Sequence, residues 1–349
     1  MQTNRLEMSP SDKKGEITIN DIAKELNISP STVSRALNDN AKISEATKEK
    51  VRAVAHDLGY ELNLVASSLS KNKTNVIGVI IPHIGSQFFA KALSGIQEVA
   101  RDNGYNVIIC QTNESVQQEK EMTRVMNSAR VDGLVCCLTM ETKDVSHFDV
   151  FVKKGVPVAM FDRVSYEVPG PKIVVDNYEA GYTATEHLVA LGCKRIAHLA
   201  GAASSKVFEE RAEGFKDALQ KNGLPLLSQF LLSSDLTEQD AREAVRLWMN
   251  LPEKPDGIVA ASASTGLVIA SAAKNMGVVL PEELSIISLG NERCNEFVTP
   301  SLSAIDMPGY DMGKSAVNQL INCIREERED SSITLKPIQL LIRNSSFKH

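Results

Sequence analysis

From residue 75 onward, short apolar runs of strand length alternate with longer stretches in which apolar residues recur at helical spacing. The strand-like runs cover residues 76–82, 106–110, 133–138, 156–161, 173–175, 195–200, 229–232, 257–261, 285–289 and 303–305. Strands that alternate with helices in this way form parallel sheets with helices on both faces. There are too many runs for one small sheet, and the pattern restarts near Tyr166. The sequence therefore predicts two Rossmann-like α/β lobes.

Size and composition agree with several compact units. The chain of 349 residues is too long for one ordinary core, and 43% hydrophobic with 23% charged residues is typical of a globular protein. Residues 1–16 are polar, and we expect them to form a disordered tail. The sequence has neither an apolar run of membrane-spanning length nor an apolar signal segment at its start, so we expect a cytoplasmic protein without a membrane partner.

The sequence lacks the short motifs of common catalytic and metal sites. It contains no phosphate loop, no Gly-x-Gly-x-x-Gly turn, no Gly-x-Ser-x-Gly elbow and no His-Glu-x-x-His segment. Its six cysteines form no Cys-x-x-Cys pair, and we expect them to be reduced. We therefore expect no enzyme activity, no metal and no cofactor.

Residues 18–38 predict two short helices joined by a tight turn. The first helix has one buried face, because its apolar residues follow the i, i+3, i+4, i+7 spacing at Ile19, Ile22, Ala23 and Leu26. Asn27 tolerates the left-handed backbone that the turn needs. Ser29 followed by Pro30 favours the start of the second helix, since serine caps a helix and proline loses no hydrogen bond at the first helical position.

The outer face of this second helix has the features of a DNA reader. It is polar and short-chained apart from Arg35, so it can approach the major groove closely. The planar guanidinium of Arg35 matches guanine O6 and N7, and the free N–H groups at the start of the helix favour a phosphate. The alternative is an ordinary surface hairpin with one solvated arginine.

The net charge of −6 does not by itself favour nucleic acid. Residues 1–73 contain 11 Lys and Arg against 10 Asp and Glu, whereas the remainder contains 27 against 34. The N-terminal segment is thus less acidic than the rest but is no basic patch. Attraction to DNA would depend on the local placement of Arg35, Lys42, Lys48, Lys50, Arg52, Lys71 and Lys73.

Residues 18–23 (Thr-Ile-Asn-Asp-Ile-Ala) and 31–38 (Ser-Thr-Val-Ser-Arg-Ala-Leu-Asn) resemble the headpiece signature of the lac repressor/galactose repressor (LacI/GalR) family. The resemblance extends over about residues 17–345. It implies an all-α helix-turn-helix headpiece at 17–61, a linker at 62–74, and a two-lobed body at 75–349 like that of periplasmic sugar-binding proteins. Lobe one would take about residues 75–162 and 291–323, and lobe two about 163–290 and 324–345. Three crossings between the lobes would form a hinge around a ligand cleft.

By this resemblance, the second helix reads bases with Pro30, Ser31 and Arg35. The residues expected to contact phosphates or otherwise complete the DNA-binding set are Thr18, Ser29, Thr32, Ser34, Asn38 and Asn63. Two such headpieces in a homodimer would read a pseudo-palindromic operator in double-stranded DNA.

In the resembled family, the linker folds into a short helix only on DNA and wedges a leucine into the minor groove. Leu69 matches that leucine, and Ala66 matches the small residue before it. The chain departs from the family where Leu62 replaces the usual Pro and Ser67 the usual Arg. The alternative is a plain flexible tether.

The resemblance also places candidate effector-binding residues where strands end, which is where α/β folds bind ligands. They are His83, Phe88, Phe89, Asp162, Asp176, Arg211, Ser262 and Asn291. Arg211 aligns with the family's main ligand-binding arginine. Each candidate has a structural alternative: the phenylalanines as core, the aspartates as helix caps or partners of Arg163, and Arg211 as a surface cation.

The candidate cleft is poorer in carboxylates than is usual for the family. Ser262-Ala263 replaces the usual Asn-Asp, His83 replaces a common Asp, and the segment around Gly290 lacks the usual Gly-Tyr/Phe-Asp-Asp pattern. We expect a nucleoid-associated transcriptional regulator, a repressor controlled by a small sugar-like effector. The alternative is the same regulator with a protein partner or with a degenerate effector cleft.

Overall fold

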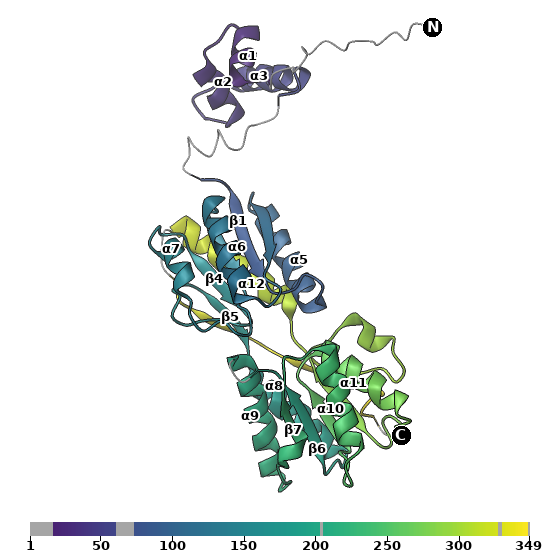
Figure 1. The fold of residues 1–349 in the computed structure, drawn as a ribbon. Coiled ribbons are helices and arrows are strands. Elements are labelled where there is room, and N and C mark those ends of the chain that lie inside the picture. The colour runs from purple at the N-terminus through teal and green to yellow at the C-terminus, as the bar shows by residue number, and fades with distance from the viewer. Residues whose placement is uncertain (1–16, 61–72, 203–204, 327–329, 348–349) are drawn as a thin grey trace, which may run out of the picture. The chain divides into compact units, whose positions relative to one another are not determined.

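The computed structural model describes residues 17–60, 73–202, 205–326 and 330–347. The chain divides into two compact units, one ending at Thr74 and the other beginning at Asn75. Each unit has its own hydrophobic core, and Figure 1 labels the elements of both.

The N-terminal unit consists of three short helices, α1 (Ile19–Glu25), α2 (Pro30–Leu37) and α3 (Glu45–Asp57). Local capping sets where they start: the Asp21 carboxylate accepts the N–H and the hydroxyl of Thr18, and the Ser29 hydroxyl accepts the Thr32 N–H at 3.1 Å. Asn27 has a φ of 52° in the turn between α1 and α2. The core of this unit is formed by Ile22, Ala23, Val33, Ala36, Val51 and Ala55. The predicted helix-turn-helix is therefore confirmed.

The first sheet of the body has six parallel strands in the order β11-β5-β4-β3-β1-β2. They are β1 (Val76–Ile81), β2 (Asn106–Gln111), β3 (Gly133–Cys136), β4 (Val158–Phe161), β5 (Lys172–Val175) and β11 (Ile333–Lys336). The helices of this lobe are α5 (Gln87–Asp102), α6 (Val116–Ser128), α7 (Asp149–Val152) and α12 (Gly309–Glu326). Residues 77–81 of β1 are buried because neighbouring strands and helices cover them.

The second sheet repeats this architecture in the order β12-β10-β9-β8-β6-β7. Its strands are β6 (Ile196–Ala200), β7 (Leu231–Ser233), β8 (Gly257–Ala260), β9 (Ser285–Leu289), β10 (Ser303–Asp306) and β12 (Gln339–Leu341), and only β12 runs antiparallel to its neighbour. Its helices are α8 (Asn177–Ala190), α9 (Lys206–Lys221), α10 (Glu238–Met249) and α11 (Ala263–Asn275). The prediction of two lobes built on largely parallel sheets is confirmed.

The boundaries expected for the lobes are wrong in three places. β5 pairs with β4 and so belongs to the first sheet, β10 pairs with β9 in the second sheet, and β11 pairs with β5 in the first. The physical reason is that the chain crosses between the lobes only after it has added a last strand to the sheet it leaves. Strand pairing decides lobe membership, and the restart of the sequence pattern near Tyr166 does not reveal it.

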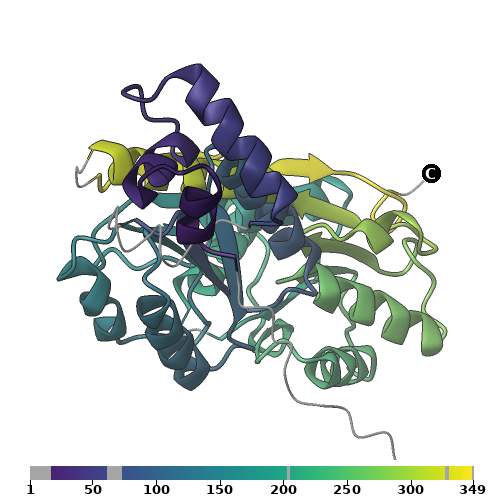
Figure 2. The same ribbon diagram turned by 90° about the horizontal axis from the view of Figure 1, so that it is seen from above.

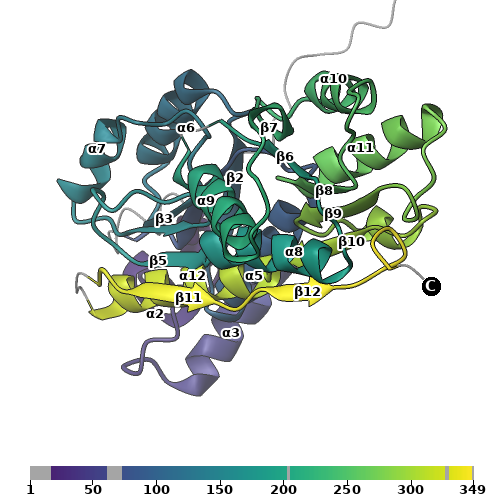
Figure 3. The ribbon, with the colours of Figure 1, turned by 90° about the horizontal axis from the view of Figure 1, so that it is seen from below.

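The chain makes three crossings between the sheets, after β5, after β10 and between β11 and β12. Figure 2 shows the two lobes side by side, with the yellow C-terminal segment spanning both. Figure 3 shows β11 and β12 following one another along one edge of the body. The three crossings implied by the resemblance are therefore present.

Glycines allow the main helix pair of each lobe to pack closely. A Cβ at Gly313 of α12 would collide with the backbone oxygen of Ala92 in α5, and a Cβ at Gly214 of α9 would collide with the backbone oxygen of Tyr178 in α8. Both collisions are with backbone, so a helix would have to move to relieve them. These contacts fix α5 and α9, which carry several candidate site residues.

We predict that Gly313→Ala lowers the free energy of unfolding by about 1–3 kcal/mol, because the added methyl group forces α12 away from α5. Gly85→Ala is the matched control, since a Cβ at Gly85 meets nothing within 4 Å. Urea titration of both variants measures the difference. Equal stability of the two variants would contradict the close packing of these helices.

Candidate DNA interface and effector cleft

The outer face of α2 presents small polar side chains around one long cation. Pro30, Ser31, Arg35 and Asn38 are exposed, while Thr32 and Ser34 are half-buried. The hydroxyl of Ser29 lies 2.8 Å from the hydroxyls of both Ser31 and Thr32, so the start of the helix is a compact cluster of hydroxyl groups. A helix N-terminus surrounded by short polar side chains suits close approach to a phosphate or a base edge.

Arg35 is not held by any other part of the headpiece. Its side chain is exposed, and it forms no ion pair within the residues that the structure describes. Asp39, by contrast, binds Lys48 at 2.9 Å and Arg52 at 3.0 Å, and Lys48 is buried. Lys48 and Arg52 are therefore both paired with Asp39 within the headpiece, and their expected attraction to DNA stays a prediction.

Of the three remaining DNA-binding candidates, the structure describes one. The Thr18 hydroxyl donates to Asp21 at 2.7 Å, so this residue serves the start of α1. Asn63 and Leu69, expected to contact DNA from the linker, lie outside the described residues.

The aromatic pair at the start of α5 is divided between core and surface. Phe89 is 6% exposed and belongs to the hydrophobic core, with its ring centroid 6.2 Å from that of Phe161. Phe88 is half-buried and contacts Phe89 edge-on, at 5.2 Å between centroids. His83 is exposed in the preceding loop. Of the two phenylalanines, Phe88 is therefore the candidate for ligand contact.

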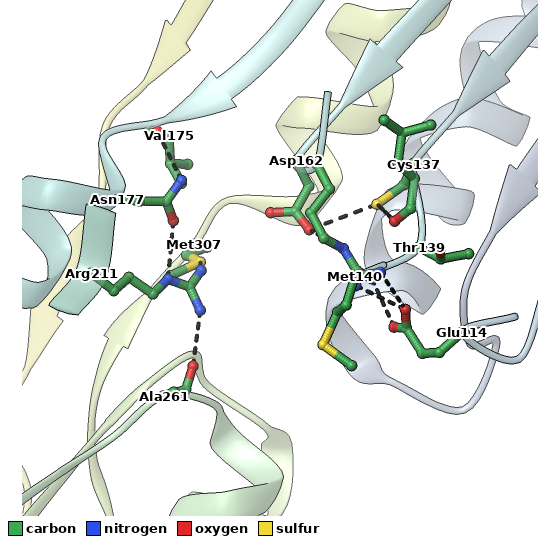
Figure 4. A network of polar contacts seen from close by, with 12 residues as sticks. Glu114, Cys137, Thr139, Met140, Asp162, Val175, Asn177, Arg211, Ala261 and Met307 are labelled. Carbon is green, nitrogen blue, oxygen red and sulfur yellow. Dashed lines mark hydrogen bonds and ion pairs between the residues drawn. The ribbon is translucent and has the colours of Figure 1, made fainter. Parts of the chain in front are cut away.

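Arg211 is a buried cation and not a surface residue. It is 6% exposed on α9, and its guanidinium donates to Asn177 Oδ1 at 3.0 Å and to the Ala261 carbonyl at 2.9 Å (Figure 4). A third contact reaches the Met307 sulfur at 3.2 Å. Burial lowers the pKa of Arg211 to about 10, and the Asp162 carboxylate opposes that shift. All three acceptors are neutral, so no carboxylate bonds directly to this guanidinium.

Arg163, the other arginine near the strand ends, is paired with a carboxylate. Arg163 binds Glu114 through both terminal nitrogens, at 3.0 and 2.9 Å, and Glu114 also accepts the Met140 N–H at 2.9 Å. Asp162 lies farther from Arg163, at 3.9 Å, and has a left-handed backbone with a φ of 62°. Glu114 has a φ of 57°. Such unfavourable backbone conformations of non-glycine residues are concentrated at functional sites.

Asp176, Ser262 and Asn291 are committed to local structure. Asp176 is exposed and caps α8 by accepting the Glu179 N–H at 2.8 Å, while Ser262 caps α11 by accepting the Thr265 N–H at 3.2 Å. Asn291 donates to Asp306 at 3.0 Å and accepts from Arg343 at 3.2 Å. The structure therefore does not join all the predicted effector residues into one contact network.

A hollow of about 410 Å³ lies beside the first crossing. It is lined by Asp162, Val164, Tyr166, Val174, Val175, Asp176, Asn177, Tyr178, Lys206, Val207, Glu210 and Glu213. Among the predicted residues, Asp162 and Asp176 line it. The polar group that sequence reasoning missed is Glu114, which follows β2. Its position at a strand end was the available signal.

Comparison with known families accounts for both units. Residues 18–63 match the family described as bacterial regulatory proteins, lacI family, and residues 74–344 match periplasmic binding proteins and sugar binding domain of LacI family. The chain belongs to the LacI family. It is accordingly a DNA-binding transcriptional regulator with a body like the periplasmic binding proteins.

Individual members of the LacI family match almost the whole chain. Catabolite control protein A of Priestia megaterium is 30% identical over 331 residues, which cover 95% of this chain and 99% of that protein. The HTH-type transcriptional repressor CytR of Escherichia coli (strain K12) is 29% identical over 329 residues, covering 94% and 96%.

Solved structures show the same fold. The lac repressor dimer bound to operator and the anti-inducer ONPF matches with a TM-score of 0.84 at 24% identity, covering 95% of this chain and 99% of that one. The complex of the transcriptional regulator CelR with cellobiose matches with a TM-score of 0.71 at 22% identity, covering 94% and 99%.

The described residues of this LacI-family chain contain neither a membrane-spanning helix nor a metal cluster. No helix there is long and apolar enough to cross a membrane. Nor does any group of three or more His, Cys, Asp or Glu side chains in those ranges have the placement needed to hold a metal ion.

We predict that Glu114→Gln lowers the free energy of unfolding by about 2–3 kcal/mol, because it leaves the Arg163 charge with only the more distant Asp162 carboxylate. The control is Glu238→Gln, which breaks the exposed Arg242 pair on α10 and should cost less than about 0.5 kcal/mol. Urea titration compares the two. A loss at Glu114 no larger than that at Glu238 would contradict a structural role for the buried pair.

Proposed function

We propose that this LacI-family regulator binds a pseudo-palindromic operator as a homodimer, represses transcription from it, and responds to a small sugar-like effector bound between its lobes. The proposed recognition of bases is supported by the exposed Arg35 guanidinium, which lies on a helix face otherwise made of short side chains. An arginine without an internal partner is free to bond to guanine in the major groove.

The predicted contacts fall into two groups. Pro30, Ser31 and Arg35 would face base edges, and the remaining polar residues of this face would bond to phosphates, as would Thr18 and Asn63. One helix-turn-helix reads one half-site, so reading a pseudo-palindrome requires two copies of the chain. The lac repressor, whose structure resembles this chain, is a dimer bound to operator.

The effector proposal rests on Arg211. Its buried guanidinium has only neutral acceptors, Asn177, Ala261 and Met307, so it retains bonding capacity for a ligand oxygen. Arg211 itself does not line the hollow, but Asn177, which accepts from Arg211, does. This hollow offers polar and aromatic surface, which suits hydroxyl-rich molecules. CelR is a relative whose solved structure contains cellobiose.

A second candidate function is favoured by one specific observation. The Ser262 hydroxyl caps α11, and Ala263 is buried. The position that has a carboxylate in the resembled pattern therefore has no carboxylate here. The alternative is the same DNA-binding regulator controlled by a protein partner, or with a cleft that binds no effector. In either case we place the protein in the cytoplasm at the nucleoid, without enzyme activity, cofactor or membrane partner.

We predict that Arg35→Ala weakens operator binding by about 1–3 kcal/mol and relaxes base preference at one position in each half-site, because it removes a bidentate contact to one base. The measurement is titration against duplexes in which each base pair of a half-site is changed in turn. Arg52→Ala is the control, since Asp39 already engages that guanidinium. A uniform loss over all duplexes would instead mean that Arg35 touches only phosphate.

We predict that Arg211→Gln abolishes the effector response while operator binding without effector stays intact, because the guanidinium is the main polar group offered to the ligand. Wild-type protein is first screened with monosaccharides, disaccharides, sugar phosphates and nucleosides for any compound that changes operator affinity. Arg242→Gln on the exposed face of α10 is the control. If the effector still changes the operator affinity of Arg211→Gln, the assignment of Arg211 to the effector cleft is contradicted. If no compound changes the operator affinity of the wild type, the protein-partner alternative is favoured.

A further inference from the structure

The two lobes meet at the start of α5 through the loop that follows β9. Both carboxylate oxygens of Glu292 accept the backbone N–H of Gln87, at 3.1 and 3.2 Å. The side-chain oxygen of Gln87 in turn accepts the backbone N–H of Arg293. Gln87 begins α5 of lobe one, and Glu292 follows β9 of lobe two, so this reciprocal pair of contacts joins the lobes.

A second contact lies at the same junction. The Lys91 ammonium, one turn further along α5, is 4.0 Å from the Asp306 carboxylate at the end of β10. Asp306 also accepts from Asn291, which is bonded to Arg343. The loop that carries Glu292 is therefore anchored within lobe two, and its carboxylate moves with that lobe.

The start of α5 needs such a partner. The first N–H groups of a helix have no acceptor inside it, and the Ser86 side chain makes no capping bond there. In α6, α8, α10 and α11, by contrast, the residue before the helix caps it with its own side chain. The carboxylate that completes α5 thus comes from the other lobe, where it also meets the favourable end of the helix dipole.

Separating the lobes would undo this arrangement. Burial raises the pKa of the Glu292 carboxyl, while the Gln87 N–H and the Lys91 charge oppose that shift. The carboxylate thus depends on lobe one for the bonds that compensate its partial burial. If the lobes part, Gln87 loses its acceptor and Lys91 loses Asp306.

We propose that Glu292 is an interlobe latch, which holds the lobes together at the start of α5 when no effector is bound. An effector that contacts the start of α5 must then displace Glu292. An effector that binds elsewhere leaves the Glu292 contact, and with it the closed arrangement of the lobes, in place. In a two-state clamp, a contact present in only one state shifts the population toward that state. The inference concerns the effector-free body and does not depend on the proposed DNA or effector contacts.

The test uses the full-length protein without DNA or effector. We expect Glu292→Ala to speed hydrogen exchange of the Gln87 amide by about tenfold or more, because that amide loses its charged acceptor. Glu296→Ala is the matched control, since Glu296 lies in the same loop but pairs with Arg343 inside lobe two. Spin labels on encoded amino acids at the exposed positions Lys153 and Glu253, one in each lobe, report the distance between the lobes.

We expect Glu292→Ala to add a population at longer interlobe distance that neither wild type nor Glu296→Ala contains. Lys91→Ala should shift the same distribution in the same direction by a smaller amount, and it keeps the test open if Glu292→Ala does not fold. Identical exchange and identical distances in all variants would overturn the latch. Because neither readout involves DNA or effector, that failure would leave the proposed function standing.

Discussion

The buried guanidinium of Arg211 joins the segments where the chain crosses between the lobes. It bonds to Asn177 directly after the first crossing, to Met307 directly after the strand that leads into the second crossing, and to Ala261 at the end of β8. Each of these contacts lies just beyond the carboxyl end of a strand, where parallel sheets leave room for ligands. A change in the environment of this one cation therefore acts on two of the three segments that join the lobes.

A charged group of the opposite sign also spans the junction between the lobes. There Glu292 of lobe two completes the first turn of α5 in lobe one, so a charged group again spans the boundary between the sheets. Close helix packing keeps both ends of this system rigid, because Gly313 seats α12 against α5 and Gly214 seats α9 against α8. Rigid lobes with a few charged contacts at their border can occupy discrete arrangements, which a two-state regulator requires.

The elements of this fold were largely predictable from the sequence. Capping signals at Ser29 and Pro30 and the apolar spacing of Ile22 and Ala23 act within a few residues, so they placed the first two headpiece helices. Lobe membership was not predictable in the same way. Whether β5 joins β4 or begins the next sheet depends on pairing between distant strands. An apolar run of four residues does not indicate with which strand it pairs.

The candidate cleft was predictable in position but not in detail. Arg211 was identified as a site residue, but its neutral partners come from three distant segments. Glu114 was missed because its partner Arg163 lies 49 positions away, and Glu292 because its acceptor role involves backbone on α5. Asp176 and Ser262 were predicted to contact a ligand. In the structure both side chains instead accept a backbone N–H at the start of a helix.

We propose that the headpiece reads specific base pairs as one half of a symmetric pair. Selection from a pool of random duplexes with the purified full-length protein is the most direct test. We expect enrichment of a pseudo-palindrome whose half-sites are read by two copies of α2. Enrichment of a single unrepeated site, or recovery of sequences no different from the starting pool, would contradict it.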